Sequence, residues 1–194
     1  MKAHEAYISP GYEALQRELH LRPKGYGGKG FKWADTVIAL LQRFDAVSIL
    51  DYGCGEGSLA RKLADRRFPW LRISEYDPAI DGKNGRPAFA DLVTVTDVLE
   101  HVEPECLSAV LGHLHGLARK AVFFVVALDE ANKVLADGRN AHLILESPEW
   151  WESKITAAGF TLLPGKELLT LPWPMAYYSP EKRAKRWIGV GIPC

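Results

Sequence analysis

Residues 48–64 read SILDYGCGEGSLARKLA, and this stretch decides the fold. Its apolar start is typical of a buried parallel strand. Three glycines, Gly53, Gly55 and Gly57, follow at alternate positions, and residues 58–68 return to helical spacing. Glycine tolerates positive φ and lets a ligand approach the backbone closely. The stretch therefore predicts a strand, a bare turn and a helix, with a ligand site at the turn.

Composition excludes several classes of protein. The chain has 194 residues, of which 47% are hydrophobic and 25% charged, which is typical of one globular domain. Twenty-four basic residues balance twenty-four acidic ones, so no global field favours a nucleic-acid or membrane partner. The longest apolar run, 121–128, is too short to span a bilayer. Three cysteines without C-x-x-C spacing, and an N-terminus without a signal-like apolar core, predict a cytoplasmic protein.

Strand and helix patterns alternate along the rest of the chain. Further strands are expected at 71–76, 91–97, 120–128, 161–163 and 186–192, and further helices after Pro10 and at 33–44, 107–117 and 147–160. This alternation predicts an α/β fold with a doubly wound, mostly parallel, Rossmann-like sheet and helices on both faces. We divide it into N-terminal helices with a glycine-rich lid (1–46) and a single core (47–194). Ligands of such sheets bind beyond the carboxyl ends of the strands.

Two carboxylates flank the glycine turn. A phosphate-binding turn would read G-x-G-x-x-G, but here Ser58 stands where the third glycine belongs. Asp51, before the first glycine, is a poor neighbour for phosphate and suits an ammonium group. Asp77 ends the second strand about twenty residues further on, where a carboxylate meets ribose hydroxyls in this topology. The alternative is that Asp77 only caps the turn at Pro78. A ligand with a ribose, an ammonium group and no phosphate is S-adenosylmethionine (SAM).

The sequence resembles the class I SAM-dependent methyltransferase family. The resemblance lies in LDYGCGEG (50–57), YDPAI (76–80), DLVTVTDVLEHV (91–102) and AHLILESPEWWESKITAAGF (141–160), in the order of the family. It implies an enzyme that transfers a methyl group from SAM. The cofactor-binding residues that it implies are Asp51, Gly53, Cys54, Gly55, Gly57, Asp77, Pro78, Thr96, Asp97 and Val98.

One departure from the family concerns its third strand. Family members usually place a helix and a strand between the ribose-binding acid and the fourth strand. Here only residues 78–90 separate Asp77 from Asp91, and they include two glycines and two prolines. We expect the third strand to be reduced or missing, which leaves the usual adenine contact without a clear counterpart.

Three residues are candidates for catalysis. Glu100 and His101 follow the fourth strand, where family members commonly face the acceptor, and either side chain is a candidate base on an acceptor hydroxyl. The structural alternative is that Glu100 caps or pairs while His101 packs. His142 precedes a helix, where small-molecule members often show a histidine, and it either lines the acceptor pocket or satisfies a loop carbonyl. No metal site is expected.

The flanking segments are expected to define the acceptor. Tyr26, Trp33 and Tyr177 stand among cations, which suits a flat or anionic small molecule, or else they fold into the core. Residues 25–33 are expected to close over the cofactor as a lid. The predicted function is O- or N-methylation of a small molecule. A nucleic-acid or protein acceptor, and a SAM-binding module without catalysis, remain alternatives.

Overall fold

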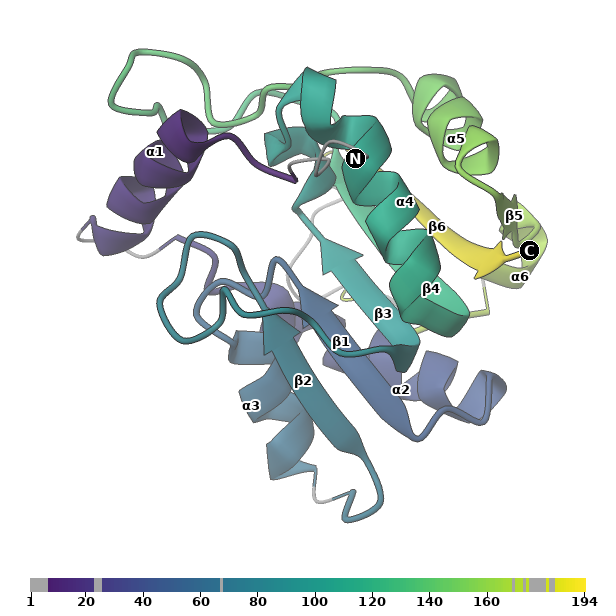
Figure 1. The fold of residues 1–194 in the computed structure, drawn as a ribbon. Helices are drawn as coiled ribbons and strands as arrows, with labels where there is room; N and C mark the ends of the chain where they lie inside the picture. The colour runs from purple at the N-terminus through teal and green to yellow at the C-terminus, as the bar shows by residue number, and fades with distance from the viewer. Residues whose placement is uncertain are drawn as a thin grey trace, which may run out of the picture.

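The protein forms a mixed α/β sheet with helices on both faces (Figure 1). The computed structural model describes residues 7–22, 26–66, 68–168, 170–172, 174, 181 and 184–194. Within them, six strands pair in the order β2-β1-β3-β4-β6-β5. β1 to β4 are mutually parallel, and β6 runs antiparallel to both β4 and β5. The bounds are β1 Ser48–Tyr52, β2 Arg72–Tyr76, β3 Ala90–Thr96, β4 Ala118–Ala127, β5 Phe160–Leu162 and β6 Arg186–Pro193. The predicted α/β fold and mostly parallel sheet are confirmed.

Helices cover the two faces of this sheet. α4 and α5 pack on one face, and α2 and α3 on the other (Figure 1). A short helix, α6, follows β5. The helices are α1 Pro10–Leu21, α2 Ala34–Arg43, α3 Ser58–Asp65, α4 Leu107–Leu117, α5 Pro148–Ala157 and α6 Gly165–Leu168, with short 3-10 turns at η1 Gly30–Trp33, η2 Leu99–His101 and η3 Pro104–Cys106. Within the described residues, no helix combines the length and the apolar character that crossing a bilayer requires.

Strand register explains why both faces are buried. Leu50, Val93 and Val122 align across β1, β3 and β4 and face the α4 side. Their chain neighbours Ile49 and Leu92 form the next row and face the α2 side. Side chains alternate along a strand, so near-continuous apolar runs are needed to fill both layers. Each fully buried aliphatic side chain contributes about 1.5–3 kcal/mol to this core.

α1 lies beyond the carboxyl ends of the strands, outside both layers (Figure 1). Ser9 caps its N-terminus, where its hydroxyl accepts from the Tyr12 N–H at 3.2 Å, and Pro10 occupies the first turn. Tyr12 and Leu19 pack against Leu135 and Ala141, which follow β4. α1 therefore roofs the edge of the sheet where ligands of this topology bind.

The connection between β2 and β3 folds back onto the glycine turn. Residues 77–89, all of them described, form turns and contain no helix or strand. Within them Asp77 N–H donates to the Lys83 carbonyl at 3.0 Å. The Lys83 ammonium group donates to the Gly55 carbonyl and to Glu75, each at 3.0 Å. This segment thus braces the turn after β1 while β3 pairs directly with β1.

Candidate functional site

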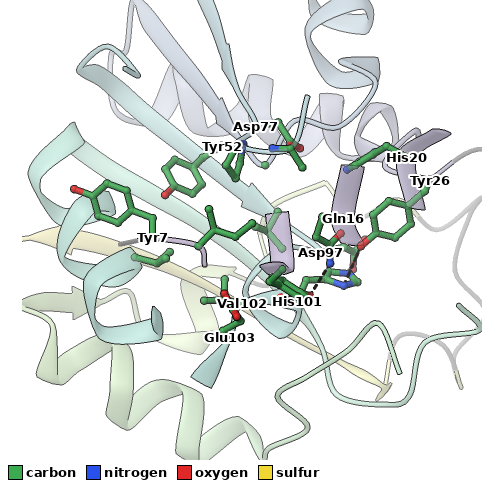
Figure 2. Close-up of a pocket in the computed structure, with 17 residues that line it drawn as sticks. Tyr7, Gln16, His20, Tyr26, Tyr52, Asp77, Asp97, His101, Val102 and Glu103 are labelled. Atoms are coloured by element: carbon green, nitrogen blue, oxygen red, sulfur yellow. Dashed lines mark hydrogen bonds between the residues drawn. The ribbon is translucent and has the colours of Figure 1, made fainter. Parts of the chain in front are cut away.

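A cavity of about 90 Å³ lies between α1 and the carboxyl ends of β1, β2 and β3 (Figure 2). The strand ends contribute seven lining residues, α1 and its flanks six, and the segment from η2 to α4 four. They are Tyr52, Gly53, Asp77, Pro78, Ala79, Asp97 and Val98; Tyr7, Ile8, Tyr12, Gln16, His20 and Tyr26; and His101, Val102, Glu103 and Val110. The structure thus brings Gly53, Asp77, Pro78, Asp97, Val98, Tyr26 and His101, all singled out from the sequence, to one cavity.

The glycine turn has a backbone that other residues would not adopt without strain. φ is +72° at Gly53, +51° at Gly55 and +74° at Gly57. A Cβ on Gly53 would lie 2.5 Å from a methyl group of Val98, and one on Gly57 would lie 2.1 Å from the Glu75 carboxylate. Close packing after β1 therefore demands glycine here, and it keeps the backbone of Gly53 open to the cavity.

The turn is also tied to the end of β2. The N–H groups of Gly53 and Cys54 both donate to the Tyr76 carbonyl, at 2.7 and 3.1 Å. Cys54 is itself buried, as is the Asp51 side chain. The glycine turn and the acid that follows β2 consequently form one rigid unit.

Asp77 anchors this unit with both carboxylate oxygens. Its Oδ2 accepts from the Gly55 N–H and its Oδ1 from the Ala79 N–H, each at 3.0 Å. The side chain is 6% exposed and lines the cavity. A carboxylate has about four acceptor sites, so about two remain for a ligand. Asp77 therefore caps the turn, as the alternative interpretation held, and it retains the capacity to bind hydroxyl groups.

Asp51 lies buried beneath the turn rather than on the cavity surface. The Thr94 hydroxyl donates to its Oδ1 at 3.1 Å. Burial raises the pKa of the Asp51 carboxyl to about 7, although the bond from Thr94 and the charge of Lys83 lower it in part. Near neutral pH this carboxyl is consequently poised between its charged and neutral forms.

The segment after β3 turns sharply at Asp97. Asp97 has φ +54°, a left-handed conformation that aspartate tolerates better than most residues. Its N–H donates to the Val125 carbonyl at 2.9 Å, and its Oδ1 accepts from the Arg186 guanidinium at 3.1 Å. Thr96, the last residue of β3, is half-buried just before this turn. The turn sends the chain across the end of the sheet into η2.

Glu100 is fully buried behind the cavity. Its Oε1 accepts from the Ala127 N–H at 3.0 Å, and its Oε2 has no hydrogen-bond partner among the described residues. Burial, together with the charge of Asp97, raises the pKa of the Glu100 carboxyl well above its usual range. Its backbone carbonyl accepts from the N–H groups of Leu143 and Ile144, at 2.7 and 3.1 Å. Glu100 therefore joins the segment after β3 to the segment around His142.

His101 presents one ring nitrogen to the cavity. Its Nδ1 lies 2.7 Å from the Ala141 carbonyl, which places the proton on Nδ1. The Tyr26 hydroxyl lies 2.9 Å from Nδ1 and 3.2 Å from Nε2, so it donates to the free Nε2 (Figure 2). Burial and, to a lesser extent, the neighbouring His142 lower the pKa of the His101 imidazole to about 3. The ring is therefore neutral at physiological pH and has an accessible lone pair.

His142 lies beside His101. The two ring centroids are 4.7 Å apart and the rings cross at 78°. The Nδ1 of His142 contacts the Asp129 carbonyl, as the alternative of a satisfied loop carbonyl held. Potential ligand atoms of Glu100, His101 and His142 all lie within 4.8 Å of one another. The three catalytic candidates thus form one compact cluster, and His101 is the member that lines the cavity.

The N-terminal loop rests directly on the glycine turn. The Gly27 carbonyl accepts from the Glu56 N–H at 3.2 Å, and the Phe31 N–H donates to the Ser58 hydroxyl at 3.2 Å. A Cβ on Gly55 would lie 2.4 Å from the Gly27 oxygen. These contacts hold the described part of the predicted lid (25–33) against the glycine turn. Closure of this lid over a bound cofactor stays a prediction.

Trp33, which was also expected at the acceptor, is not among the residues that line this cavity. Trp33 is 2% exposed and packs in the α2 layer, 5.5 Å from the Phe123 ring, so it follows the alternative in which the aromatic ring folds into the core. Tyr177 lies outside the described residues, as do Trp173 and Tyr178 beside it.

The roof of the cavity contains residues that sequence reasoning missed. Tyr12, Gln16 and His20 recur every four residues along α1 and all line the cavity. The Tyr12 hydroxyl donates to the His101 carbonyl and accepts from Gln16, each at 2.6 Å. The Ser9 hydroxyl and N–H donate to Glu103 at 2.6 and 2.7 Å. The spacing of four was visible in the sequence, and it indicates one polar face on this helix.

Comparisons with known proteins agree with the fold. A family model described as a methyltransferase domain matches residues 26–171. No curated protein matches the chain by sequence. The structure of 1,6-didemethyltoxoflavin-N1-methyltransferase from Burkholderia thailandensis has a TM-score of 0.62 at 16% identity, covering 96% of this chain and 91% of that chain.

Two further solved structures share the fold. Magnesium protoporphyrin IX methyltransferase from Synechocystis, with bound SAH, has a TM-score of 0.57 at 18% identity and covers 97% of this chain and 96% of that chain. Human N-acetylserotonin methyltransferase, in complex with SAM, has a TM-score of 0.51 at 12% identity. That match covers 94% of this chain but only 55% of the human chain.

Proposed function

The chain belongs to the family of SAM-dependent methyltransferase domains, and we propose that it transfers the methyl group of SAM to an oxygen or nitrogen atom of a small molecule. The observation that carries this proposal is the cavity under α1, which both the glycine turn, through Gly53, and His101 line. Cofactor and acceptor would meet there, and methyl transfer needs such positioning above all.

The residues around the cavity fit SAM, which supplies an electrophilic methyl group when bound. Asp77 offers its remaining acceptor sites to ribose hydroxyls, at the carboxyl end of β2. Pro78, Ala79 and Val98 offer apolar contacts to the nucleoside. Asp51, buried beneath the glycine turn with a pKa raised to about 7, would in its charged form favour an ammonium group near the turn. We propose that these residues, with the backbone of the turn, hold the cofactor.

We also propose that residues 77–89 take the place of the family's third strand. Their turns brace the glycine turn through Lys83, and none of these residues joins the sheet, in which β2 is the edge strand. The adenine would then lie against Pro78 and Ala79 instead of against a strand end. Residues 1–46 would serve as the cover of the site, with the lid loop 26–31 resting on the glycine turn.

The enclosure of the site favours a small acceptor. Tyr7, Tyr12 and Tyr26 line the cavity from the N-terminal side, and α1 roofs it. Aromatic walls suit a flat molecule. The three solved structures above are named for toxoflavin, porphyrin and N-acetylserotonin chemistry, which supports a small-molecule acceptor here. His101, with Glu100 and His142 behind it, forms the face that would receive the atom to be methylated.

The test is to incubate the protein with methyl-labelled SAM and, separately, low-mass metabolites, RNA and protein from a cell extract. We expect label in low-mass compounds other than SAM, together with an equal amount of SAH, the demethylated product of SAM. Label confined to RNA or to protein would overturn the small-molecule acceptor. SAM binding without label in any fraction would instead favour a binding module without catalysis.

A further inference from the structure

We propose that Glu100, His101 and His142 bind one divalent transition-metal cation beside the acceptor end of the cavity. The inference rests on the proposed function, because such a cation would draw an acceptor hydroxyl to the His101 face and lower its pKa. It departs from the expectation, drawn from the sequence, that the protein has no metal site. The three side chains come from η2 and from the loop before α5.

Both histidines are held in the state that metal ligation needs. The Nδ1 of His101 donates to the Ala141 carbonyl at 2.7 Å, and the Nδ1 of His142 faces the Asp129 carbonyl. Metal-bound histidines almost always donate their second ring nitrogen to a carbonyl or carboxylate in this way. The arrangement fixes the tautomer of each ring and leaves the lone pair on Nε2, which in His101 faces the Tyr26 hydroxyl, at 3.2 Å.

Glu100 supplies an independent sign of a missing partner. Its side chain is fully buried, yet its Oε2 has no hydrogen-bond partner among the described residues. A buried polar atom that is left unpaired loses its hydration without compensation, and the loss is greater when the atom is charged. Because Oε1 already accepts from the Ala127 N–H, the carboxylate is oriented and only Oε2 remains to be satisfied. A cation among the three side chains would satisfy it.

The donor set and its spacing identify the kind of metal. Two imidazoles and one carboxylate with open positions form the ligand set of catalytic Zn²⁺ and of non-haem Fe²⁺ sites. Two ligand atoms that each lie about 2.0–2.2 Å from one ion are at most about 4 Å apart. The ligand atoms of this cluster lie within 4.8 Å of one another, so side-chain movements of roughly 1 Å complete the site.

The open position of this site would face the cavity. His101 lines the cavity, and the Tyr26 hydroxyl reaches its Nε2 at 3.2 Å (Figure 2). That contact shows that a hydroxyl group can approach this nitrogen. An acceptor hydroxyl that displaced Tyr26 would therefore stand next to the cation.

The experiment is a calorimetric titration of the full chain, after treatment with a chelator and without SAM, using Mn²⁺ and Zn²⁺ separately. The parent and all variants carry Cys194→Ser, so that the exposed Cys194 thiol does not bind the added ions. We expect one ion per chain. Glu100→Gln retains an acceptor for the Ala127 N–H, and His142→Ala removes a half-buried ring from a loop, so both variants should fold. Each should weaken metal binding at least ten-fold.

The matched control is His115→Asn, since His115 lies on α4 against Phe160 and away from the cluster. It should bind the ion like the parent. Absence of binding by the parent, or equal affinity of Glu100→Gln, His142→Ala and the parent, would overturn the metal site. Because the titration contains neither SAM nor acceptor, its failure leaves the methyltransferase proposal standing. A protein that binds the ion but never transfers a methyl group would refute only the proposed function.

Discussion

Replacing Asp77 by asparagine should both destabilise the folded protein and weaken SAM binding. The two carboxylate oxygens accept from Gly55 and Ala79 N–H groups at 3.0 Å each. Asparagine keeps one acceptor oxygen and turns an NH₂ donor toward the other N–H group. One lost bond to a charged acceptor is worth about 1.5–3 kcal/mol. We therefore expect the free energy of unfolding to fall by about 2 kcal/mol and Tm by roughly 4–8 °C.

The effect on SAM comes from the acceptor sites of Asp77 that the backbone leaves free. If they bind the ribose hydroxyls, their loss costs a further 1.5–3 kcal/mol or so, which is about ten-fold or more in Kd. This loss is separate from the loss of stability, because it is measured on protein that is still folded at the assay temperature.

Two measurements on the same samples test this reasoning. The Tm measured without ligand shows how much Asp77 stabilises the glycine turn. The Kd for SAM, measured by calorimetric titration, shows whether Asp77 binds the ribose. Asp65→Asn is the control, since Asp65 is exposed at the end of α3, and it should leave both values unchanged. If Asp77→Asn melts earlier but binds SAM like the parent, Asp77 is a turn cap only and its assignment to the cofactor is wrong.

Three further variants probe the surroundings of the cavity. Gly55→Ala would place a Cβ 2.4 Å from the Gly27 oxygen, on a residue whose φ is +51°. We therefore expect a loss of at least about 1 kcal/mol of stability and faster protease cleavage near Gly27. A melting temperature and a cleavage pattern like those of the parent would contradict this prediction. The pKa of Asp51 is raised from 3.8 to about 7, so the stabilisation that its neutral form provides is complete below about pH 4 and is lost as pH rises toward 7. Asp51→Asn should flatten the dependence of Tm on pH across that window, and an unchanged slope would refute the role given to burial. Tyr12→Phe removes a hydroxyl that donates to the His101 carbonyl at 2.6 Å. The free energy of unfolding, measured with denaturant, should fall by about 1 kcal/mol. A denaturation midpoint equal to that of the parent would show that this contact between α1 and the segment after β3 is not stabilising.

The sheet and the glycine turn could be predicted because their signals are local. All three signals lie within twenty residues: the apolar run before Gly53, the alternate glycines and the helical spacing after Ser58. The conformation of each of these elements is determined by the residues within it. Asp77 could be placed for the same reason, since it ends a strand at a known distance from the turn. The sequence did not show that Asp77 also holds the glycine turn. Its bond to the Gly55 N–H joins the ends of two different strands, which are 22 positions apart in the chain.

The composition of the roof and of the histidine cluster could not be read in the same way. His101 and His142 meet because the Glu100 carbonyl binds the N–H groups of Leu143 and Ile144, more than forty positions away, and the His101 ring contacts the Ala141 carbonyl. α1 reaches the cavity through Ser9 and Glu103, which are still further apart. Such long-range contacts depend on tertiary packing. The helical periodicity of α1 predicts that the helix has a polar face, but it does not predict which residues that face contacts. The burial of Trp33 depends on packing in the same manner.

Hydrogen–deuterium exchange with and without SAM tests most directly whether the cofactor binds at the carboxyl ends of β1, β2 and β3 beneath α1. We predict slower exchange on SAM addition in residues 53–58, 77–79 and 97–103, and in the covering segments 10–22 and 26–31. The far ends of the same strands should be unaffected. Protection elsewhere, or exchange that saturating SAM leaves unchanged in the turn at 53–58, would contradict the site described above.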